Sequence, residues 1–297
     1  MTVALPIALA LVSSATAAHG LHDVAAPDAA RWSFEPWVMV CLGLSAGFYA
    51  VGFARLSKRA GFGRGVSPIA AAAFAAGWVV LVAALISPLD ALGSALFSAH
   101  MVQHELLMII AAPLLVLGRP LAVWVWAFPP ESRSLLGRFF HRPAWRVPWL
   151  ALTTPFSAWV LHALALWLWH LPAWFETALA NEFVHAIQHV CFLGTALLFW
   201  WSVLGVVTRR DRGIALLSLF TTMVHTGALG ALLALSMVVW YPIYRASAPV
   251  WGLTALQDQQ LGGIVMWVPA GFVYVACALF LAGRWLSEPR RAFAPPR

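Results

Sequence analysis

Charged residues are scarce in this sequence. Asp, Glu, Lys and Arg together make up 10% of the 297 residues, whereas 62% are hydrophobic. A soluble domain carries about a quarter charged residues, so this composition excludes an ordinary soluble protein and indicates an integral membrane protein. The apolar residues fall into runs of roughly 20, and each run is long enough to cross about 30 Å of hydrocarbon.

Cysteine is also rare. Cys41, Cys191 and Cys277 each lie inside an apolar run with no second cysteine nearby. This spacing gives no CxxC site and favours small packing residues. The sequence also lacks a Walker loop, a GxGxxG motif before a helix and a GxSxG motif. The nucleotide-binding and hydrolase functions that depend on those motifs are therefore not indicated.

The first 18 residues have the pattern of a signal peptide. A short apolar core is followed by small residues, and Ala15-Thr16-Ala17 fits an A-x-A cleavage site. The segment contains no Lys or Arg, so an uncleaved anchor is the alternative. Residues 19–35 would then form an outer N-terminal arm. Cleavage after Ala18 would give His19 a free amine that could chelate Cu(II), with His22 close by.

Seven further apolar runs predict membrane-spanning helices. The stretch after Gly118, RPLAVWVWAFPP, is too short to span, so we expect it in the interface or in a re-entrant position. The fold class is therefore an all-α polytopic membrane protein, with a seven-helix bundle over residues 36–285 and a tail at 286–297. The predicted spans are residues 36–55, 67–87, 95–117, 155–171, 182–207, 214–240 and 260–283.

The basic residues predict the orientation of the bundle. All but two of the 18 Lys and Arg residues fall in the loops after the first, third and fifth predicted spans and in the tail; the exceptions are Arg31 and Arg245. The positive-inside rule makes these loops and the C-terminus cytoplasmic, with the N-terminus outside. The positive charge thus reports topology, and we expect no nucleic-acid partner. Most acidic residues fall on the outer side, which favours cations there.

Two histidine pairs share one pattern, HxxQH. HMVQH places His100 and His104 in the third predicted span, and HAIQH places His185 and His189 in the fifth. A spacing of four residues puts both rings on one helix face, where they can share a metal ion. Both spans enter from the outer side, so the four rings are expected about 5–13 Å deep, and His170 ends the fourth span in the same layer. The alternative is a set of histidines satisfied by hydrogen bonds between helices.

The ligand types favour copper. Imidazole with thioether suits Cu(I), whereas zinc more often brings Cys or a carboxylate. At about 100° per residue, Met101 and Glu105 fall on the histidine side of the third span, so both are candidate ligands. Cys191 points away from the histidines of the fifth span and is excluded. A single bis-histidine haem is the alternative, because each pair covers only about 6 Å of helix axis and two stacked haems would not fit.

Three segments then carry a resemblance to a known family: HMVQHELLMIIAAPLLVLGRPL, HAIQHVCFLGTALLFWWSVLG and DQQLGGIVMWVPAG. In this order they resemble the CtaG family of cytochrome c oxidase assembly factors (the Bacillus-type, seven-span family), over the second to the last predicted span. The resemblance implies a multi-pass protein of the bacterial cytoplasmic (inner) membrane that is needed to build a haem–copper oxidase and that handles copper. It also implies roles for the four paired histidines, Asp258 and Met266.

The last of these segments also has a physical interpretation. Asp258 opens the last span, where it is either a helix N-cap or a cation-receiving group at the mouth. Met266 follows eight residues later, on roughly the same side and about 12 Å deeper. The LGG sequence between them predicts close helix packing.

We therefore expect a copper-binding assembly factor, not an enzyme. Copper would be captured at the acidic outer mouth, held by the histidine pairs with help from Met, and passed by ligand exchange to cytochrome c oxidase subunits. Periplasmic copper chaperones are candidate donors, and membrane lipid surrounds the bundle. The alternatives are a haem-binding electron-transfer protein, a purely structural oxidase scaffold, and a copper permease whose path would be lined by His162 and His225.

Overall fold

The computed structural model describes residues 31–205 and 209–287. The predicted signal peptide, His19 and His22 lie outside these ranges. Within them the chain forms helices and no strands, which confirms the all-α prediction. Most of the α-helices begin with proline, a residue whose fixed φ suits the first helical position and whose missing N–H costs nothing there.

The elements in chain order are α1 (Pro36–Ala60), α2 (Pro68–Leu85), α3 (Pro88–Ala95), α4 (Phe97–Glu105), the π-helix η2 (Leu106–Ala111), α5 (Ala112–Leu117), α6 (Pro120–Trp124), the 3₁₀-helix η3 (Val125–Ala127), α7 (Pro130–Phe140), α8 (Pro143–Leu152), α9 (Pro155–Trp169), α10 (Pro172–Ala180), α11 (Glu182–Leu204), α12 (Arg209–Ala234), the 3₁₀-helices η4 (Pro242–Arg245) and η5 (Ala248–Trp251), and α13 (Ala255–Ser287).

Six helical segments of the described chain are long and apolar enough to cross a membrane. They are α1, α2, the continuous α4–η2–α5 segment, α11, α12 and α13. A seventh span results if α8 and α9, which meet at a 68° bend, are counted as one. The protein is therefore a multi-pass membrane protein, and each predicted span corresponds to one of these helices. The RPLAVWVWAFPP stretch forms the short α6 and η3, as its length predicted.

Several predicted span boundaries differ from the structure, among them the ends of the sixth and fourth spans. The sixth span was expected to run to residue 240, but α12 ends at Ala234. Side chains of α13 bind the following backbone instead: Gln259 accepts a hydrogen bond from Trp240 N at 2.6 Å, and Gln260 donates to the Ser236 carbonyl at 3.0 Å. The fourth span was expected over 155–171, but α9 has 15 residues and covers only about 22 Å at 1.5 Å per residue.

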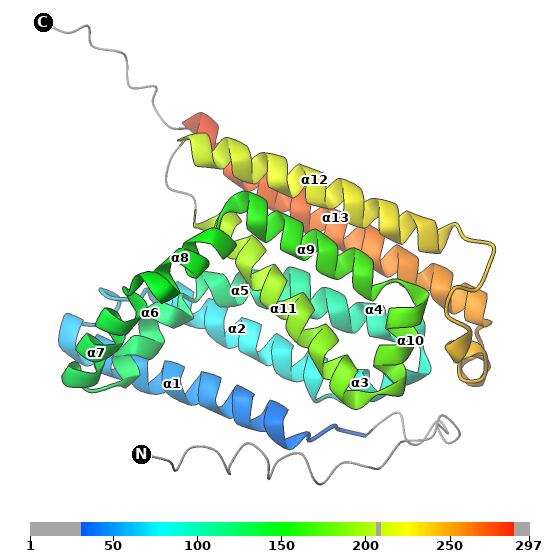
Figure 1. Ribbon diagram of the computed structural model, residues 1–297, viewed down its shortest axis with the longest axis horizontal. Helices are drawn as coiled ribbons and strands as arrows, with labels where there is room; N and C mark the ends of the chain where they lie inside the picture. Colours follow the sequence, from blue (N-terminus) through cyan, green and yellow to red (C-terminus); the bar gives the residue numbers. More distant parts are fainter. Residues whose placement is uncertain (1–30, 206–208, 288–297) are drawn as a thin grey trace, which may run out of the picture.

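The helices pack as a bundle with two distinct ends (Figure 1). α12 lies along α13, α4 packs against α13, and α11 packs against α9 and α5, while α2 packs on α5 and η2. We call the right-hand end of Figure 1, with α3, α10 and residues 235–254, the histidine end. The left-hand end, with α6, α7 and α8, is the basic end, because Lys58, Arg59 and Arg138 lie in the last turns of α1 and α7 there.

Close packing of α12 and α13 depends on glycine. A Cβ atom on Gly263 would lie 2.4 Å from the Ala234 nitrogen and 2.6 Å from the Gly230 carbonyl oxygen. A Cβ atom on the preceding Gly262 would lie 2.4 Å from the Phe97 ring. The two glycines therefore let α13 fit between α12 and α4, which confirms the close packing predicted from LGG.

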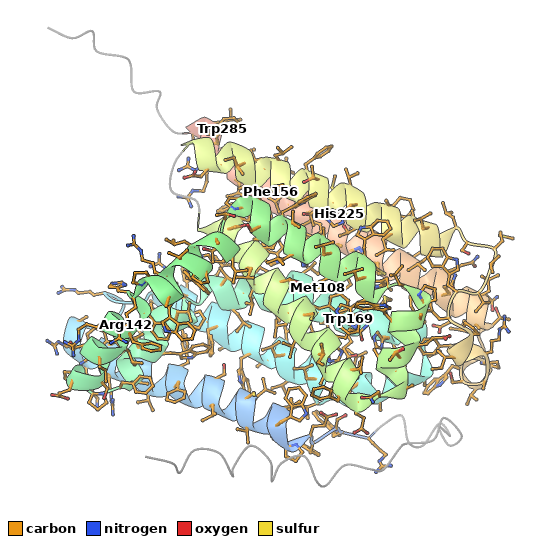
Figure 2. All side chains as sticks on the ribbon, in the orientation of Figure 1. Met108, Arg142, Phe156, Trp169, His225 and Trp285 are labelled. Atoms are coloured by element: carbon orange, nitrogen blue, oxygen red, sulfur yellow. The ribbon has the colours of Figure 1, made fainter. Side chains whose placement is uncertain are left out.

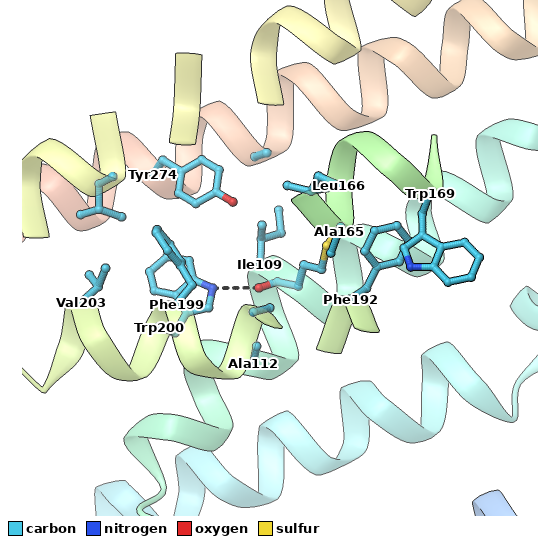
Figure 3. Close-up of a cluster of buried hydrophobic side chains, with 14 of the residues drawn as sticks. Ile109, Ala112, Ala165, Leu166, Trp169, Phe192, Phe199, Trp200, Val203 and Tyr274 are labelled. Atoms are coloured by element: carbon cyan, nitrogen blue, oxygen red, sulfur yellow. Dashed lines mark hydrogen bonds between the residues drawn. The ribbon is translucent and has the colours of Figure 1, made fainter. Parts of the chain in front are cut away.

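The middle of the bundle is an apolar core that contains a π-helix. Figure 3 shows Trp200 of α11 donating its indole N–H to the Met108 carbonyl of η2, at 2.8 Å. Met108, Phe192, Phe199 and Trp200 all belong to one buried hydrophobic cluster. The hydrogen bond ties α11 to the segment that follows HMVQH. Single π-turns inside α-helices are frequent near functional sites.

Candidate metal centre

Five histidines from three helices gather at the histidine end. His100 and His104 come from α4, His185 and His189 from α11, and His170 directly follows α9. Ring centroids lie 4.2 Å apart within each HxxQH pair. Between the helices they lie 5.3 Å apart for His100 and His185, 5.6 Å for His104 and His189, and 6.2 Å for His104 and His170. The structure thus brings together all five histidines that the sequence placed in one layer, here called the five-histidine cluster.

Three members of the cluster have metal-binding spacing. Among the described residues, one nitrogen each of His100, His185 and His189 lie within 4.8 Å of one another. Ligand nitrogens about 2 Å from a shared ion stand ~3–4 Å apart, so small rotations would bring these three rings onto one ion. His104 and His170 border this trio through the ring contacts given above.

The cluster is buried, and most of its nitrogens have no hydrogen-bond partner. His100, His104, His170 and His189 are each 8% exposed or less. Both nitrogens of His100 and His104, and the Nε2 atoms of His170, His185 and His189, are buried without a partner. Leaving a buried polar group unpaired costs about 1–3 kcal/mol. So many unpaired imidazole nitrogens in one place are the main observation that points to a bound ion.

His170 is held in a ligand-competent tautomer. Its Nδ1 lies 2.6 Å from the Leu166 carbonyl oxygen. A carbonyl only accepts hydrogen bonds, so Nδ1 carries the proton and Nε2 keeps its lone pair. Fixing one imidazole nitrogen in this way is the usual means of orienting a histidine toward a metal. The unpaired Nε2 of His170 is thus a potential ligand.

Asp258 holds the helix that carries the first histidine pair. Its carboxylate accepts hydrogen bonds from Phe97 N at 2.6 Å, Ser98 N at 3.0 Å and Ser98 Oγ at 2.5 Å. These N–H groups open α4, whose own cap residue, Leu96, has no side-chain acceptor. Asp258 therefore caps α4 from α13, across 161 residues of sequence. It is fully buried, so it does not lie at an open mouth.

The second histidine helix is capped locally. Asn181 accepts a hydrogen bond from Val184 N at 3.1 Å, directly before the HAIQH motif on α11. Both helices with HxxQH motifs thus begin at a side-chain cap within a few residues of their histidines. The caps fix the first turn of each helix and, with it, the direction in which the rings point.

The other sequence candidates lie around the cluster and not among its three closest ligands. Met101 and Met266 are buried in an aromatic cluster with Phe97, Phe175 and other rings. Glu105 is buried with one carboxylate oxygen unpartnered, and it interacts electrostatically with Tyr274 of α13. The metal-binding roles predicted for these residues stay predictions.

The glutamines of the two motifs are residues that the sequence reasoning missed. Gln103 donates to the Ala84 carbonyl and to Asp90, both at 2.8 Å, and so joins α4 to α3. Gln188 is fully buried and lies beside His100, with which its amide interacts without a well-formed hydrogen bond. The signal that could have found them was the repeated Gln at the fourth motif position.

Acidic groups lie near His185, the most exposed histidine of the five-histidine cluster. His185 is partly buried, whereas the other four are buried, and Asp90 and Glu182 interact with it electrostatically. Glu35, which precedes α1, lies near the same two acids. Burial raises the pKa of Glu35, the hydrogen bond from Trp37 lowers it, and the charges of Asp90 and Glu182 raise it further. The edge of the cluster at His185 therefore has the negative potential that attracts cations.

A protein-family model matches most of the chain. Residues 47–288 match the family model described as cytochrome c oxidase caa3 assembly factor. The chain is 28% identical over 277 residues to uncharacterised proteins of Mycobacterium bovis and Mycobacterium tuberculosis, and 25% identical over 274 residues to one of Mycobacterium leprae. These alignments cover 88% of this chain and 40% of each relative, so the chain spans less than half of their length. No solved structure matches the chain.

Proposed function

The chain belongs to the cytochrome c oxidase caa3 assembly factor family, and from that premise we propose that it binds copper at the five-histidine cluster and delivers it to the oxidase. The observation that carries the proposal is the set of unpartnered, buried imidazole nitrogens contributed by α4, α9 and α11. Copper is the cargo in this scheme. Delivery requires ligands that bind copper and then release it by ligand exchange, and the protein catalyses no covalent reaction in this scheme.

The donor set suits Cu(I) better than the alternatives. The three closest ligands are all imidazoles, which are neutral, so a monovalent ion is less costly to bury than a divalent one. Zinc sites more often include a thiolate or carboxylate. A bis-histidine haem needs a wide slot between two rings, but the rings of His100, His185 and His189 lie 4.2–6.3 Å from one another, which favours a bare ion.

The basic end fixes the direction of transfer in this proposal. Lys and Arg gather on cytoplasmic loops of membrane proteins, so the histidine end faces outward from the bacterial inner membrane. Copper then arrives from the periplasm, with a periplasmic copper chaperone as donor and an oxidase subunit as acceptor. His185 is the point of exchange, because it is the most exposed ligand and lies beside Asp90 and Glu182.

Metal analysis of the purified protein tests this proposal. We expect the His100→Ala/His189→Ala variant to lose most of the copper that copurifies with the unchanged protein, and to fail to restore oxidase activity in cells that lack this gene. His141→Ala is the matched control, because His141 is exposed at the end of α7 near the basic end. Equal copper in the double variant and the unchanged protein would refute the shared site. Normal oxidase activity with the double variant would refute delivery.

A further inference from the structure

The two remaining histidines of the spans, His162 of α9 and His225 of α12, lie together deeper in the bundle. His162 stands eight residues before His170 on α9, which places it about 12 Å further from the histidine end. His225 lies partway along α12 (Figure 2). α9 packs against α12, and the His225 ring lies 5.8 Å from the ring of Trp159, which stands about one turn before His162 on α9. We call His162 and His225 the inner pair.

Unpaired polar atoms surround the inner pair. Both ring nitrogens of His225, the hydroxyl of Thr222 and the indole N–H of Trp159 are buried without hydrogen-bond partners. The Trp159 and His225 rings lie 5.8 Å apart, so these groups come from facing parts of α9 and α12. An imidazole lone pair left unmet in an apolar bundle is unfavourable, and a metal ion can meet it, whereas the indole N–H is a donor and cannot bind a cation.

Hydrogen bonding orients His162 as a ligand. The Thr195 hydroxyl donates its proton to the Cys191 carbonyl at 2.7 Å. The same oxygen lies 3.2 Å from His162 Nδ1, so it can only accept there, and Nδ1 must carry the hydrogen. The lone pair of His162 is therefore on Nε2. On α12, the Thr222 hydroxyl stands three residues before His225 on the same face, and no hydrogen bond joins the two side chains.

An apolar layer separates the inner pair from the five-histidine cluster. Leu166 lies between His162 and His170 on α9, and Phe192 lies between His189 and Thr195 on α11; both are buried in the central hydrophobic cluster. The Phe192 ring is 4.5 Å from His104 on one side, and Phe199 stacks on His162 at 5.3 Å on the other. The inner pair therefore shares no ligand with the cluster.

We propose that His162 and His225 form a second metal site, specific for a soft monovalent ion such as Cu(I). Two imidazoles can hold such an ion in low coordination. Trp159, Thr195 and Phe199, which lie beside the pair, are uncharged. The cost of burying an ion grows with the square of its charge, so a divalent ion would be disfavoured. This site stands on its own ligands, and it does not depend on delivery of copper by the outer cluster.

Silver(I) is a suitable probe because it is a soft, monovalent ion with the ligand preferences of Cu(I). The full-length chain is purified in detergent as the His100→Ala/His185→Ala/His189→Ala variant, which removes the three closest outer ligands and leaves the inner pair unchanged. Bound Ag(I) is then measured by mass spectrometry after dialysis against a competing ligand. Adding His225→Leu is expected to remove one equivalent of Ag(I), whereas adding His225→Met is expected to keep it, because a thioether is also a soft donor.

Leu and Met are similar in size, so the comparison separates ligation from packing. Equal Ag(I) binding by the Leu and Met variants, whether both keep or both lose the ion, would overturn the inner site. X-ray absorption of the Ag(I)-loaded protein with His162 and His225 unchanged supplies a second test. Imidazole nitrogens around silver support the site, and their absence refutes it. Copper retained by the His100→Ala/His189→Ala variant is expected at the inner pair, so only copper that also survives the addition of His225→Leu counts against the proposed function.

Discussion

Replacing Asp258 tests how the first histidine helix is held. The Asp258 side chain is fully buried and accepts three hydrogen bonds from Phe97 and Ser98 at the start of α4. A hydrogen bond to a charged group contributes about 1.5–3 kcal/mol. The three bonds share one carboxylate and are not additive, so Asp258→Ala should lower the free energy of unfolding by about 3–5 kcal/mol.

The Asp258→Ala substitution should also weaken metal binding at the candidate metal centre. His100 lies three residues after Phe97, within the first turn of α4 that the carboxylate fixes. Fraying of that turn should weaken metal binding at His100, His185 and His189. Denaturation in mixed micelles measures the free energy of unfolding, and Ag(I) titration of the same samples measures the affinity.

A neighbouring residue provides the control. Gln257 is exposed and forms a local capping box with Thr254 at the start of α13, with bonds of 2.9 and 3.2 Å. Gln257→Ala should cost only about 0.5–1 kcal/mol and leave metal affinity unchanged. If Asp258→Ala unfolds no more easily than Gln257→Ala, the cap does not hold α4. If Asp258→Asn keeps stability but loses metal affinity, Asp258 acts as a cation-receiving group, and our reasoning about its role is wrong.

Three further predictions concern packing and protons. Gly263→Ala should separate α12 from α13 and lower the free energy of unfolding by about 1–3 kcal/mol, because the new Cβ would lie 2.4 Å from the Ala234 nitrogen. Gly271→Ala is the control and should leave stability unchanged, because open space surrounds Gly271. Trp200→Phe removes the 2.8 Å hydrogen bond to the Met108 carbonyl and should cost about 1–3 kcal/mol, whereas an unchanged unfolding curve would mean that the bond contributes nothing. Metal affinity of the five-histidine cluster should fall as pH falls, because only neutral imidazole binds a metal; a titration series that shows no change between neutral and acidic pH would exclude histidine ligation.

Much of the fold could be predicted because it depends on local pattern. Apolar runs of membrane length mark the spans, and a four-residue spacing puts two histidines on one face of a helix whatever surrounds it. Matching depth then placed His100, His104, His185 and His189 in one layer. The structure agrees because both helices start at the same end of the bundle.

Features that depend on distant contacts could not be predicted. Asp258 was expected to act at its own helix or at a mouth, but it caps α4, which lies 161 residues away in the sequence. The end of α12 at Ala234 depends on Gln259 and Gln260 of α13. The π-turn after Glu105 has no marker in an apolar run of Leu, Met and Ile. In each case a side chain or backbone from another helix decides the local structure.

The short α9 affects the lipid beside it. Its 15 residues cover about 22 Å, whereas the hydrocarbon layer of a bilayer is about 30 Å thick. Lipids next to α9 must therefore compress or tilt to avoid exposing the helix ends, at a cost that grows with each ångström of hydrophobic mismatch. Thinning at the end of α9 that His170 follows would bring headgroups and water closer to the five-histidine cluster. Acyl-chain length should thus tune how readily ions reach the cluster, and thicker bilayers should slow its loading.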